Sequence, residues 1–364
     1  MPENVYRDDK ILMHLDRLHA LRLSRVPAPI HVHFVPSDKC NQNCNFCAYR
    51  IDGYTEFFAE KRPDGTLRRN PHRMMPYEKA RGILSDCAKM GVKAIEFTGG
   101  GEPTVHPHCA GLMNYARSLG METALVTNGW KMGEDIRAAL LSATWVRISL
   151  DCATPDTYQK ERRVPGTVLA EVLENIKALV AARNKAQSSL VIGIGYVITE
   201  DNWQEVIRGV ELARDLGVDN IRLSAVFQAQ NASYFDGFGE DAARRCRMAV
   251  TLSTDTFRVI NNFDLRFGEL LQGSPEFKRC PFQTLVPYIG ADLNVYRCCV
   301  MSYRKRGLVA SLANQTLEQL WTSEEYRQDY LNFDARGCER CQFLDRNRTI
   351  NRFIDMDIPH GAFV

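Results

Sequence analysis

The sequence contains no long apolar stretch. No run of about 18 apolar residues occurs in its 364 positions, which argues against a membrane-spanning helix. The N-terminal stretch MPENVYRDDKILMHLDRLHAL is charged and amphipathic, without the apolar core of a signal peptide. Net charge is nearly absent as well, because 46 basic residues face 44 acidic ones. Charge therefore indicates neither a nucleic acid nor a membrane partner, and we expect a cytoplasmic protein.

Internal repeats and low-complexity segments are also missing. The composition, 45% hydrophobic and 25% charged, is ordinary for a globular protein. A chain of this length can form one large domain and a smaller one, each with a buried core.

Cysteine, by contrast, is abundant, with twelve residues. Without a signal peptide, clustered cysteines are expected to be metal ligands rather than disulfides. Cys40, Cys44 and Cys47 lie within the stretch CNQNCNFC. Three thiolates can hold three irons of a [4Fe–4S] cluster and leave the fourth iron to a non-protein ligand. A structural zinc site completed by His31 or His33 is the alternative, although closed zinc sites usually contain Cys-x2-Cys pairs.

Short β-rich runs alternate with longer helical patterns between residues 30 and about 230. Six such units predict a parallel sheet with right-handed crossovers, closed into a barrel or open and doubly wound. The expected strands are IHVHFV (30–35), AIEFT (94–98), TALVT (123–127), WVRISL (145–150), LVIGIGYVI (190–198) and IRLSAVF (221–227). In both arrangements functional residues lie at the carboxyl ends of the strands. CNQNCNFC, TGGGEP, TNG and SLD lie at the ends of the first, second, third and fourth expected strands.

A second group of cysteines appears near the C-terminus. Cys280, Cys298, Cys338 and Cys341 follow a looser segment, and the last two form a Cys-x2-Cys pair. Four thiolates suit a fully ligated iron–sulfur cluster, and they suit structural zinc as well.

The spacing Cys-x3-Cys-x2-Cys, with an aromatic before the last cysteine, resembles the signature of the radical S-adenosylmethionine (radical SAM) enzymes. The resemblance implies a partial (β/α)6 TIM-like barrel, with a small C-terminal α+β auxiliary domain of the twitch type, the shortened relative of the SPASM domain. Cys40, Cys44 and Cys47 would bind a [4Fe–4S] cluster whose open iron is chelated by SAM. An electron donor such as flavodoxin or ferredoxin would then drive reductive cleavage of SAM to a 5′-deoxyadenosyl radical. A second [4Fe–4S] cluster would be held by Cys280, Cys298, Cys338 and Cys341.

Further stretches resemble the SAM pocket of that family. TGGGEP matches its Gly-Gly-Glu motif, where glycine permits close backbone approach and a carboxylate pairs with the methionyl ammonium. In SLDCATPDTYQKERRVPGT, Ser149 and Arg162 match a serine and an arginine that contact SAM, and Arg163 competes for the arginine role. Cys152 stands where the family often has glycine, which leaves the local backbone open to question. The SAM contacts implied are Phe46, Gly100, Gly101, Glu102, Asn128, Ser149, Asp151 and Arg162.

The resemblance divides the chain and favours a reaction. We expect an N-terminal helical extension (1–29), the barrel (30–230), linker helices (231–275), the auxiliary domain (276–345) and a tail (346–364). Twitch-containing relatives oxidise sugars and aminocyclitols, and the 29 residues before the first strand are few for a leader-peptide module. A small-molecule substrate is therefore favoured.

Other functions stay open. They are radical isomerisation or epimerisation, with Cys299 as a candidate hydrogen donor, modification of a nucleotide, nucleic acid or peptide, and a non-catalytic metal-binding scaffold. The basic run KRPDGTLRRNPHR (61–73) could clamp a phosphate, but a solvated surface loop is favoured for such a run.

Overall fold

The computed structural model describes residues 8–51, 54–62, 66–229 and 231–357, and one mixed sheet runs through its centre. The strand order is β12-β11-β10-β1-β4-β5-β6-β7-β8-β9, and neighbours from β1 to β9 are parallel. The parallel strands are β1 (His31–Phe34), β4 (Ala94–Phe97), β5 (Glu122–Thr127), β6 (Trp145–Ser149), β7 (Val191–Ile198), β8 (Asn220–Ala225) and β9 (Arg258–Asn261). The six strands expected from the sequence are all present, which confirms the α/β barrel class.

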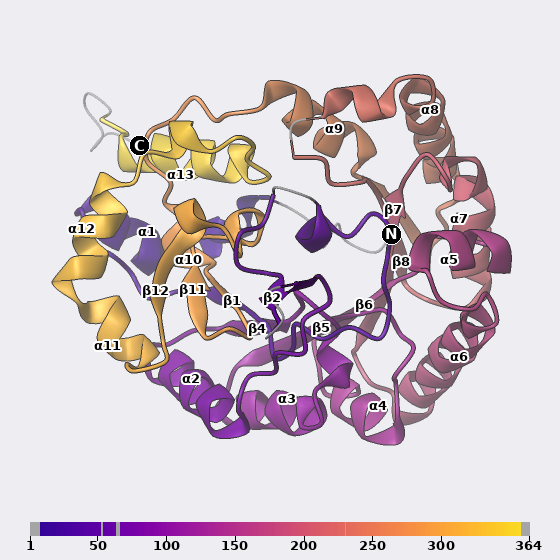
Figure 1. Ribbon diagram of the computed structural model, residues 1–364, viewed down its shortest axis with the longest axis horizontal. Coiled ribbons are helices and arrows are strands. Elements are labelled where there is room, and N and C mark those ends of the chain that lie inside the picture. Colours follow the sequence, from indigo (N-terminus) through magenta and orange to yellow (C-terminus); the bar gives the residue numbers. More distant parts are fainter. Residues whose placement is uncertain (1–7, 52–53, 63–65, 230, 358–364) are drawn as a thin grey trace.

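Helices surround the parallel strands, as Figure 1 shows. Outward-facing side chains such as Val32, Ile95 and Leu125 are fully buried against them, because each strand alternates its side chains between two faces. The surrounding helices are α2 (Tyr77–Lys89), α3 (Cys109–Ser118), α4 (Glu134–Leu140), α5 (Pro155–Arg162), α6 (Val168–Ala186), α7 (Val206–Asp215) and α8 (Gly239–Ala249). Within the described ranges, no helix combines the length and the apolar character needed to cross a bilayer.

Residues 231–275, expected as linker helices, also extend the barrel sheet. Strand β9 pairs in parallel with β8, from Asn220↔Arg258 to Leu223↔Asn261. The strand is four residues long and polar at both ends, so its sequence carries no alternation from which it could be predicted. Helix α9 (Phe263–Gln272) follows it. The barrel therefore continues beyond the boundary at residue 230.

The C-terminal unit continues the same sheet on its other edge. Strand β10 (Tyr288–Ile289) pairs in parallel with β1, and β11 (Asn294–Tyr296) and β12 (Leu308–Ser311) follow antiparallel. Helices α10 (Phe282–Leu285), α11 (Leu317–Thr322) and α12 (Glu324–Asn332) complete this flank of the molecule, coloured orange to yellow in Figure 1. Main-chain pairing with β1 thus joins the auxiliary unit directly to the strand that precedes CNQNCNFC.

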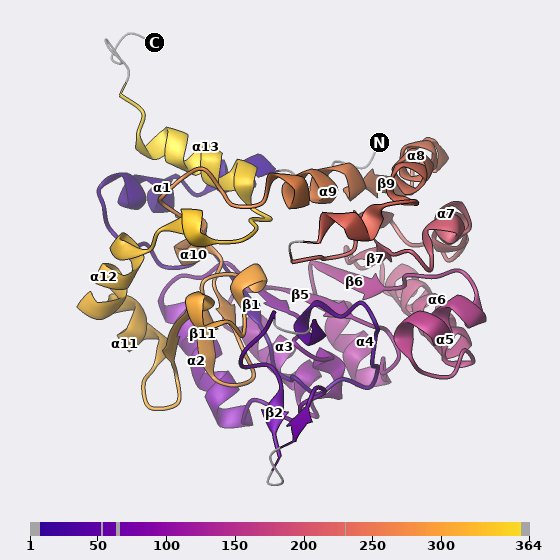
Figure 2. The same ribbon diagram turned by 45° about the horizontal axis from the view of Figure 1, so that its top comes forward.

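The segment expected as a tail contains most of an ordered helix. Helix α13 (Leu344–Ile354) packs against α1 (Leu15–Arg22), with Leu18, Leu21 and Ile350 in one buried cluster. Figure 2 shows both helices on the side of the molecule away from the hairpin of β2 (Glu60–Lys61) and β3 (Leu67–Arg68). The apolar face of α13 explains its docking, so residues 346–354 belong to the fold.

Candidate functional site

Two distant segments hold the loop CNQNCNFC after β1. Asn70 brackets Cys40: its side-chain oxygen accepts from the Cys40 amide at 3.1 Å, and its side-chain amide donates to the Cys40 carbonyl at 3.0 Å. On the other side, the amides of Asn43 and Asn45 donate to backbone carbonyls at the end of α5, at 3.1 and 2.9 Å. The backbone of the cysteine loop is therefore fixed by the Asn70 side chain of the basic segment and by the main chain of α5.

Burial and mutual repulsion act on the thiols of this loop. Burial raises the pKa of the Cys40 thiol to about 12, and the nearby Cys44 thiol adds to the rise. Burial also raises the pKa of Cys47, again with a contribution from Cys44. Thiols that are hard to ionise alone become thiolates when a metal takes them as ligands. The donor set therefore fits an iron–sulfur cluster held through three thiolates.

The loop GGGEP after β4 lies directly against the loop that carries the cysteines. A Cβ atom at Gly101 would lie 2.4 Å from the Asp38 carbonyl, and one at Gly100 would lie 2.6 Å from Asp38 Oδ1. Only glycine permits this approach. The buried Glu102 carboxylate accepts from the Asn128 amide at 2.7 Å and joins this loop to the end of β5. Burial raises the pKa of Glu102, although these hydrogen bonds counteract the rise.

Arg162, at the end of α5, is buried beneath the cysteine loop. Its guanidinium donates to the Ser149 carbonyl at 2.8 Å and pairs with the Asp151 carboxylate, the two side chains being 6% and 1% exposed. The same group donates to Cys44 Sγ at 3.4 Å and lies 5.4 Å from the centroid of the Phe46 ring. Arg162 thus joins the end of β6 and Asp151 to the cysteine loop.

The structure answers two questions that the sequence leaves open here. Arg163 is exposed at the helix C-cap, with φ 53°, whereas Arg162 faces the cysteine loop. Cys152 is buried and is not among the described residues with positive φ, so its position does not require glycine. Asn128 donates from its side chain to Asn41 Oδ1 at 2.7 Å, a contact that links the TNG turn to the cysteine loop.

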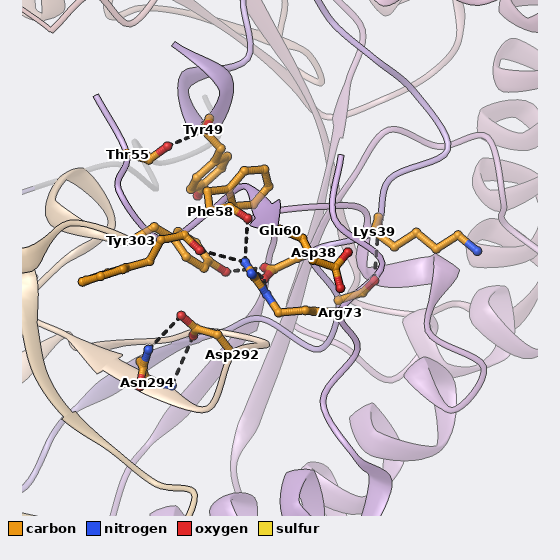
Figure 3. Close-up of polar contacts among 12 residues, drawn as sticks. Asp38, Lys39, Tyr49, Thr55, Phe58, Glu60, Arg73, Asp292, Asn294 and Tyr303 are labelled. Carbon is orange, nitrogen blue, oxygen red and sulfur yellow. Dashed lines mark hydrogen bonds and ion pairs between the residues drawn. The ribbon is translucent and has the colours of Figure 1, made fainter. Parts of the chain in front are cut away.

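Arg73, at the end of the basic segment, is anchored rather than solvated. It pairs with the fully buried Asp38 at 2.8 Å and donates to the Phe58 carbonyl at 2.8 Å, as Figure 3 shows. The Tyr303 hydroxyl donates to the other oxygen of Asp38. Burial raises the pKa of Asp38 to about 7, even though Arg73 lowers it. The expectation of a solvated loop is therefore wrong for Arg73, which ties the basic segment to the cysteine loop and the C-terminal unit.

The second group of cysteines comes together in the C-terminal unit. One cavity is lined by Cys280, Cys298, Cys338 and Cys341. Burial raises the pKa of Cys280 to about 12, with further contributions from Cys341 and Cys338, and raises that of Cys341 to about 12. Four convergent buried thiols fit a fully ligated [4Fe–4S] cluster, and tetrahedral zinc takes the same donors.

The concave face of the barrel sheet holds polar side chains, among them the two histidines considered as ligands of a zinc site. The Nε2 atoms of His31 and His33 each lie 3.7 Å from the same Glu96 oxygen, so the histidines face Glu96 and not the cysteine loop. Burial lowers the pKa of His33, but Glu96 and the nearby Cys299 thiol raise it, and its pKa lies above the ordinary value. The signal available in the sequence was the polar residue at alternate positions of the strands HVHF and AIEF.

A partial parallel barrel with three cysteines after its first strand, and four more in a unit whose strand β10 pairs with that strand, is typical of a protein with two iron–sulfur sites. The chain belongs to the radical SAM superfamily. The model of that superfamily matches residues 34–210, and the SPASM model, an iron-sulfur cluster-binding domain, matches residues 280–342. SAM and [4Fe–4S] clusters are accordingly its cofactors.

The comparisons with known proteins agree on the fold and differ in the named activities. A tungsten-containing aldehyde ferredoxin oxidoreductase cofactor-modifying protein of Pyrococcus furiosus is 25% identical over 340 residues, covering 85% of this chain and 86% of that protein. Fe-coproporphyrin III synthase of Methanosarcina barkeri is 23% identical over 361 residues, covering 90% and 84%. The crystal structure of Streptococcus suis SuiB bound to the precursor peptide SuiA has a TM-score of 0.62 at 13% identity, covering 92% of this chain and 74% of that one. Native anSMEcpe with bound AdoMet has a TM-score of 0.59 at 14% identity, covering 90% and 96%.

Proposed function

We propose that this radical SAM enzyme cleaves SAM reductively and abstracts a hydrogen atom from a small molecule held on the concave face of its barrel, most simply to oxidise it. The observation that carries the proposal is the convergence of the cysteine loop, the GGGEP loop and Arg162 at one end of the strands. These segments are far apart in the sequence, and each matches a stretch of the SAM pocket.

Cys40, Cys44 and Cys47 are the proposed ligands of the SAM-binding cluster. When bound, the reduced cluster and SAM would supply a 5′-deoxyadenosyl radical that takes a hydrogen atom from the substrate. The protein's part is to hold SAM: Glu102 offers a fixed carboxylate to an ammonium, and Arg162 offers positive charge to a carboxylate. The full set of proposed SAM contacts is Phe46, Gly100, Gly101, Glu102, Asn128, Ser149, Asp151 and Arg162.

An oxidation removes a second electron and a proton after the hydrogen atom has left. The auxiliary cluster proposed on Cys280, Cys298, Cys338 and Cys341 would accept that electron, and solvent or a basic side chain would accept the proton. Support comes from the Cys299 thiol. It follows the proposed ligand Cys298 and lies near enough to His33 and Tyr49 to raise the pKa of both. The auxiliary site therefore adjoins the concave face.

Epimerisation is the second candidate, and Cys299 favours it. A thiol beside the concave face could return a hydrogen atom to a substrate radical, so that the composition of the substrate is unchanged. In that case Cys299→Ala should form no product while it still produces 5′-deoxyadenosine. The product of the wild-type enzyme should gain deuterium from heavy water. An enzyme that oxidises its substrate by dehydrogenation would instead release a product lighter by two hydrogens, and its Cys299→Ala variant would stay active.

The names of similar proteins suggest which substrate classes to test. The expected sugar or aminocyclitol has no counterpart among the relatives described above. The two relatives that align over most of the chain are named for a tungsten-containing cofactor and for iron coproporphyrin. A cofactor or cofactor precursor is therefore the first substrate class to test, followed by sugars, nucleotides and peptides. Flavodoxin or ferredoxin is the proposed electron donor.

Iron analysis and SAM cleavage test the proposal together. Anaerobically reconstituted protein should hold about eight irons per chain, as two cubane clusters require, and should form 5′-deoxyadenosine with SAM and dithionite. Cys44→Ala should abolish 5′-deoxyadenosine formation. Cys87→Ala, which changes a fully buried core cysteine on α2, is the matched control and should retain it. Zinc without iron, or SAM cleavage by Cys44→Ala, would contradict the proposal and favour a metal-binding scaffold.

A further inference from the structure

Polar side chains from separate strands line the concave face of the barrel sheet. Along β6, Val146 and Ile148 are buried among the helices, whereas Trp145, Arg147 and Ser149 alternate with them and are only half-buried. Half-buried side chains on a central strand mean that solvent reaches this concave face. Glu96 on β4 lies on the same face, since the nearby charges of His33, Arg147 and Arg222 on β8 hold its pKa below the ordinary value against the effect of burial.

Arg147 is the member of this group whose guanidinium N–H groups donate no hydrogen bond to another described residue. Its side chain crosses toward β7, where a Cβ at Gly195 would lie 3.3 Å from Arg147 Cδ. The guanidinium lies 5.5 Å from the centroid of the Trp145 ring. Among the residues that the structure describes, it has no hydrogen-bond acceptor and no direct ion pair. Its nitrogens are not among the buried, unpartnered polar atoms of the described residues, so the guanidinium reaches solvent and can take an anionic acceptor.

The charge on this face decides which kind of ligand it suits. His31, His33 and Glu96 converge closely enough to suggest a divalent metal. However, burial lowers the pKa of His31 to about 4, so this histidine is neutral, and the single carboxylate of Glu96 already faces Arg147 and Arg222. A divalent cation would add to this excess of positive charge in a partly desolvated space, whereas an anion would neutralise it.

We infer that the concave face is a receptor for an oxyanion group, a carboxylate or a phosphate, of the substrate, and that the Arg147 guanidinium binds it. This inference rests on the proposed function, because it names the chemistry of the substrate held there. Arg147 provides the planar fork that matches two oxygens, and Arg222 adds positive charge from β8, which is separated from β6 by β7. The Glu96 carboxylate would repel an anion on its own side and so direct it toward Arg147.

Trp145 makes the inference testable without turnover. Iodide, an anionic quencher, and acrylamide, a neutral one, are titrated into the reconstituted wild-type protein, and the Trp145 contribution is obtained by difference from Trp145→Phe. Arg147→Gln should lower the iodide quenching constant of Trp145 by about threefold. This is the factor by which the attraction of one positive charge at roughly 6 Å in water raises the local concentration of iodide. Acrylamide quenching should stay the same, which also shows that the variant is folded. Arg147→Lys should keep most of the iodide effect.

The matched control is Arg81→Gln, which removes one charge from α2 on the outer surface, where Arg81 lies 4.5 Å from the centroid of the Tyr115 ring. It should change neither quenching constant. Tricarballylate and inorganic phosphate then compete with iodide: protection by the first identifies a carboxylate receptor, and protection by the second a phosphate receptor. Equal iodide quenching of Arg147→Gln and wild type, or protection by neither competitor, would overturn the inference. Failure of the proposed function would instead appear as wild-type protein that forms no 5′-deoxyadenosine.

Discussion

Replacing Arg162 by glutamine removes the positive charge that neutralises Asp151 in the interior. The two side chains are 6% and 1% exposed, so Asp151 would remain as a buried carboxylate without its counter-ion. Breaking such a pair from one side costs about 3–5 kcal/mol. With an unfolding entropy of about 2.1 cal/mol/K per residue, a chain of 364 residues should lose roughly 4–7 °C in its melting midpoint. The variant also loses the donor to Cys44 Sγ, so 5′-deoxyadenosine formation should fall with the midpoint.

Circular dichroism of the anaerobic holoprotein, at one scan rate for all variants, measures the midpoint. Arg163→Gln is the control, since it removes the same charge from the exposed neighbouring position. The double variant Asp151→Asn/Arg162→Gln leaves no buried charge and should recover part of the loss, because the Val197 amide still finds an acceptor on the asparagine. A melting midpoint for Arg162→Gln within 1 °C of wild type, or a double variant as unstable as the sum of the two single ones, would refute the reasoning.

Three further outcomes are expected. Burial raises the pKa of Asp38 from 3.8 to about 7, so the folded state binds this proton more tightly than the unfolded chain does. The stability that protonated Asp38 contributes is therefore lost as the pH rises from 3.8 through about 7. Asp38→Asn does not titrate, so urea unfolding should show its free energy of unfolding rising by roughly 3 kcal/mol relative to wild type between pH 5 and pH 8. Gly101→Ala, whose Cβ would meet backbone atoms at 2.4 Å, should lose SAM cleavage, whereas Gly111→Ala, with open space around its Cβ, should keep both cleavage and melting midpoint. Cys298→Ala should lower the iron content from about eight to about four per chain while the SAM-binding cluster keeps its electron paramagnetic resonance signal.

The elements that follow local patterns could be predicted from the sequence. Apolar runs of four to eight residues between amphipathic helices mark the strands β1 and β4 to β8, and cysteine spacing marks both iron–sulfur sites. Strand β9 could not be predicted, because four residues with polar ends acquire strand structure only by pairing with β8. The position of helix α13 could not be predicted either, because its docking depends on the apolar face of α1, more than 300 residues away.

Some residues of the candidate site could be predicted from the sequence, and others could not. Its cysteines, the glycines of GGGEP and the pair Arg162 and Arg163 could be predicted from motifs, but only the structure showed that Arg162 is the one that faces the cysteine loop. The role of Arg73 could not, because a run of basic residues has the same composition whether it is solvated or, as here, paired with the buried Asp38.

The sequence alone thus determined the cofactors and the class of chemistry, since the spacing of three thiols and of four thiols is a property of short segments. Only the tertiary structure decided what surrounds the substrate space. Glu96, Arg147 and Arg222 come from three different strands, and strand register, set by pairing across the whole sheet, places them on one concave face. The same pairing places the auxiliary unit on the edge of β1, beside the cysteine loop.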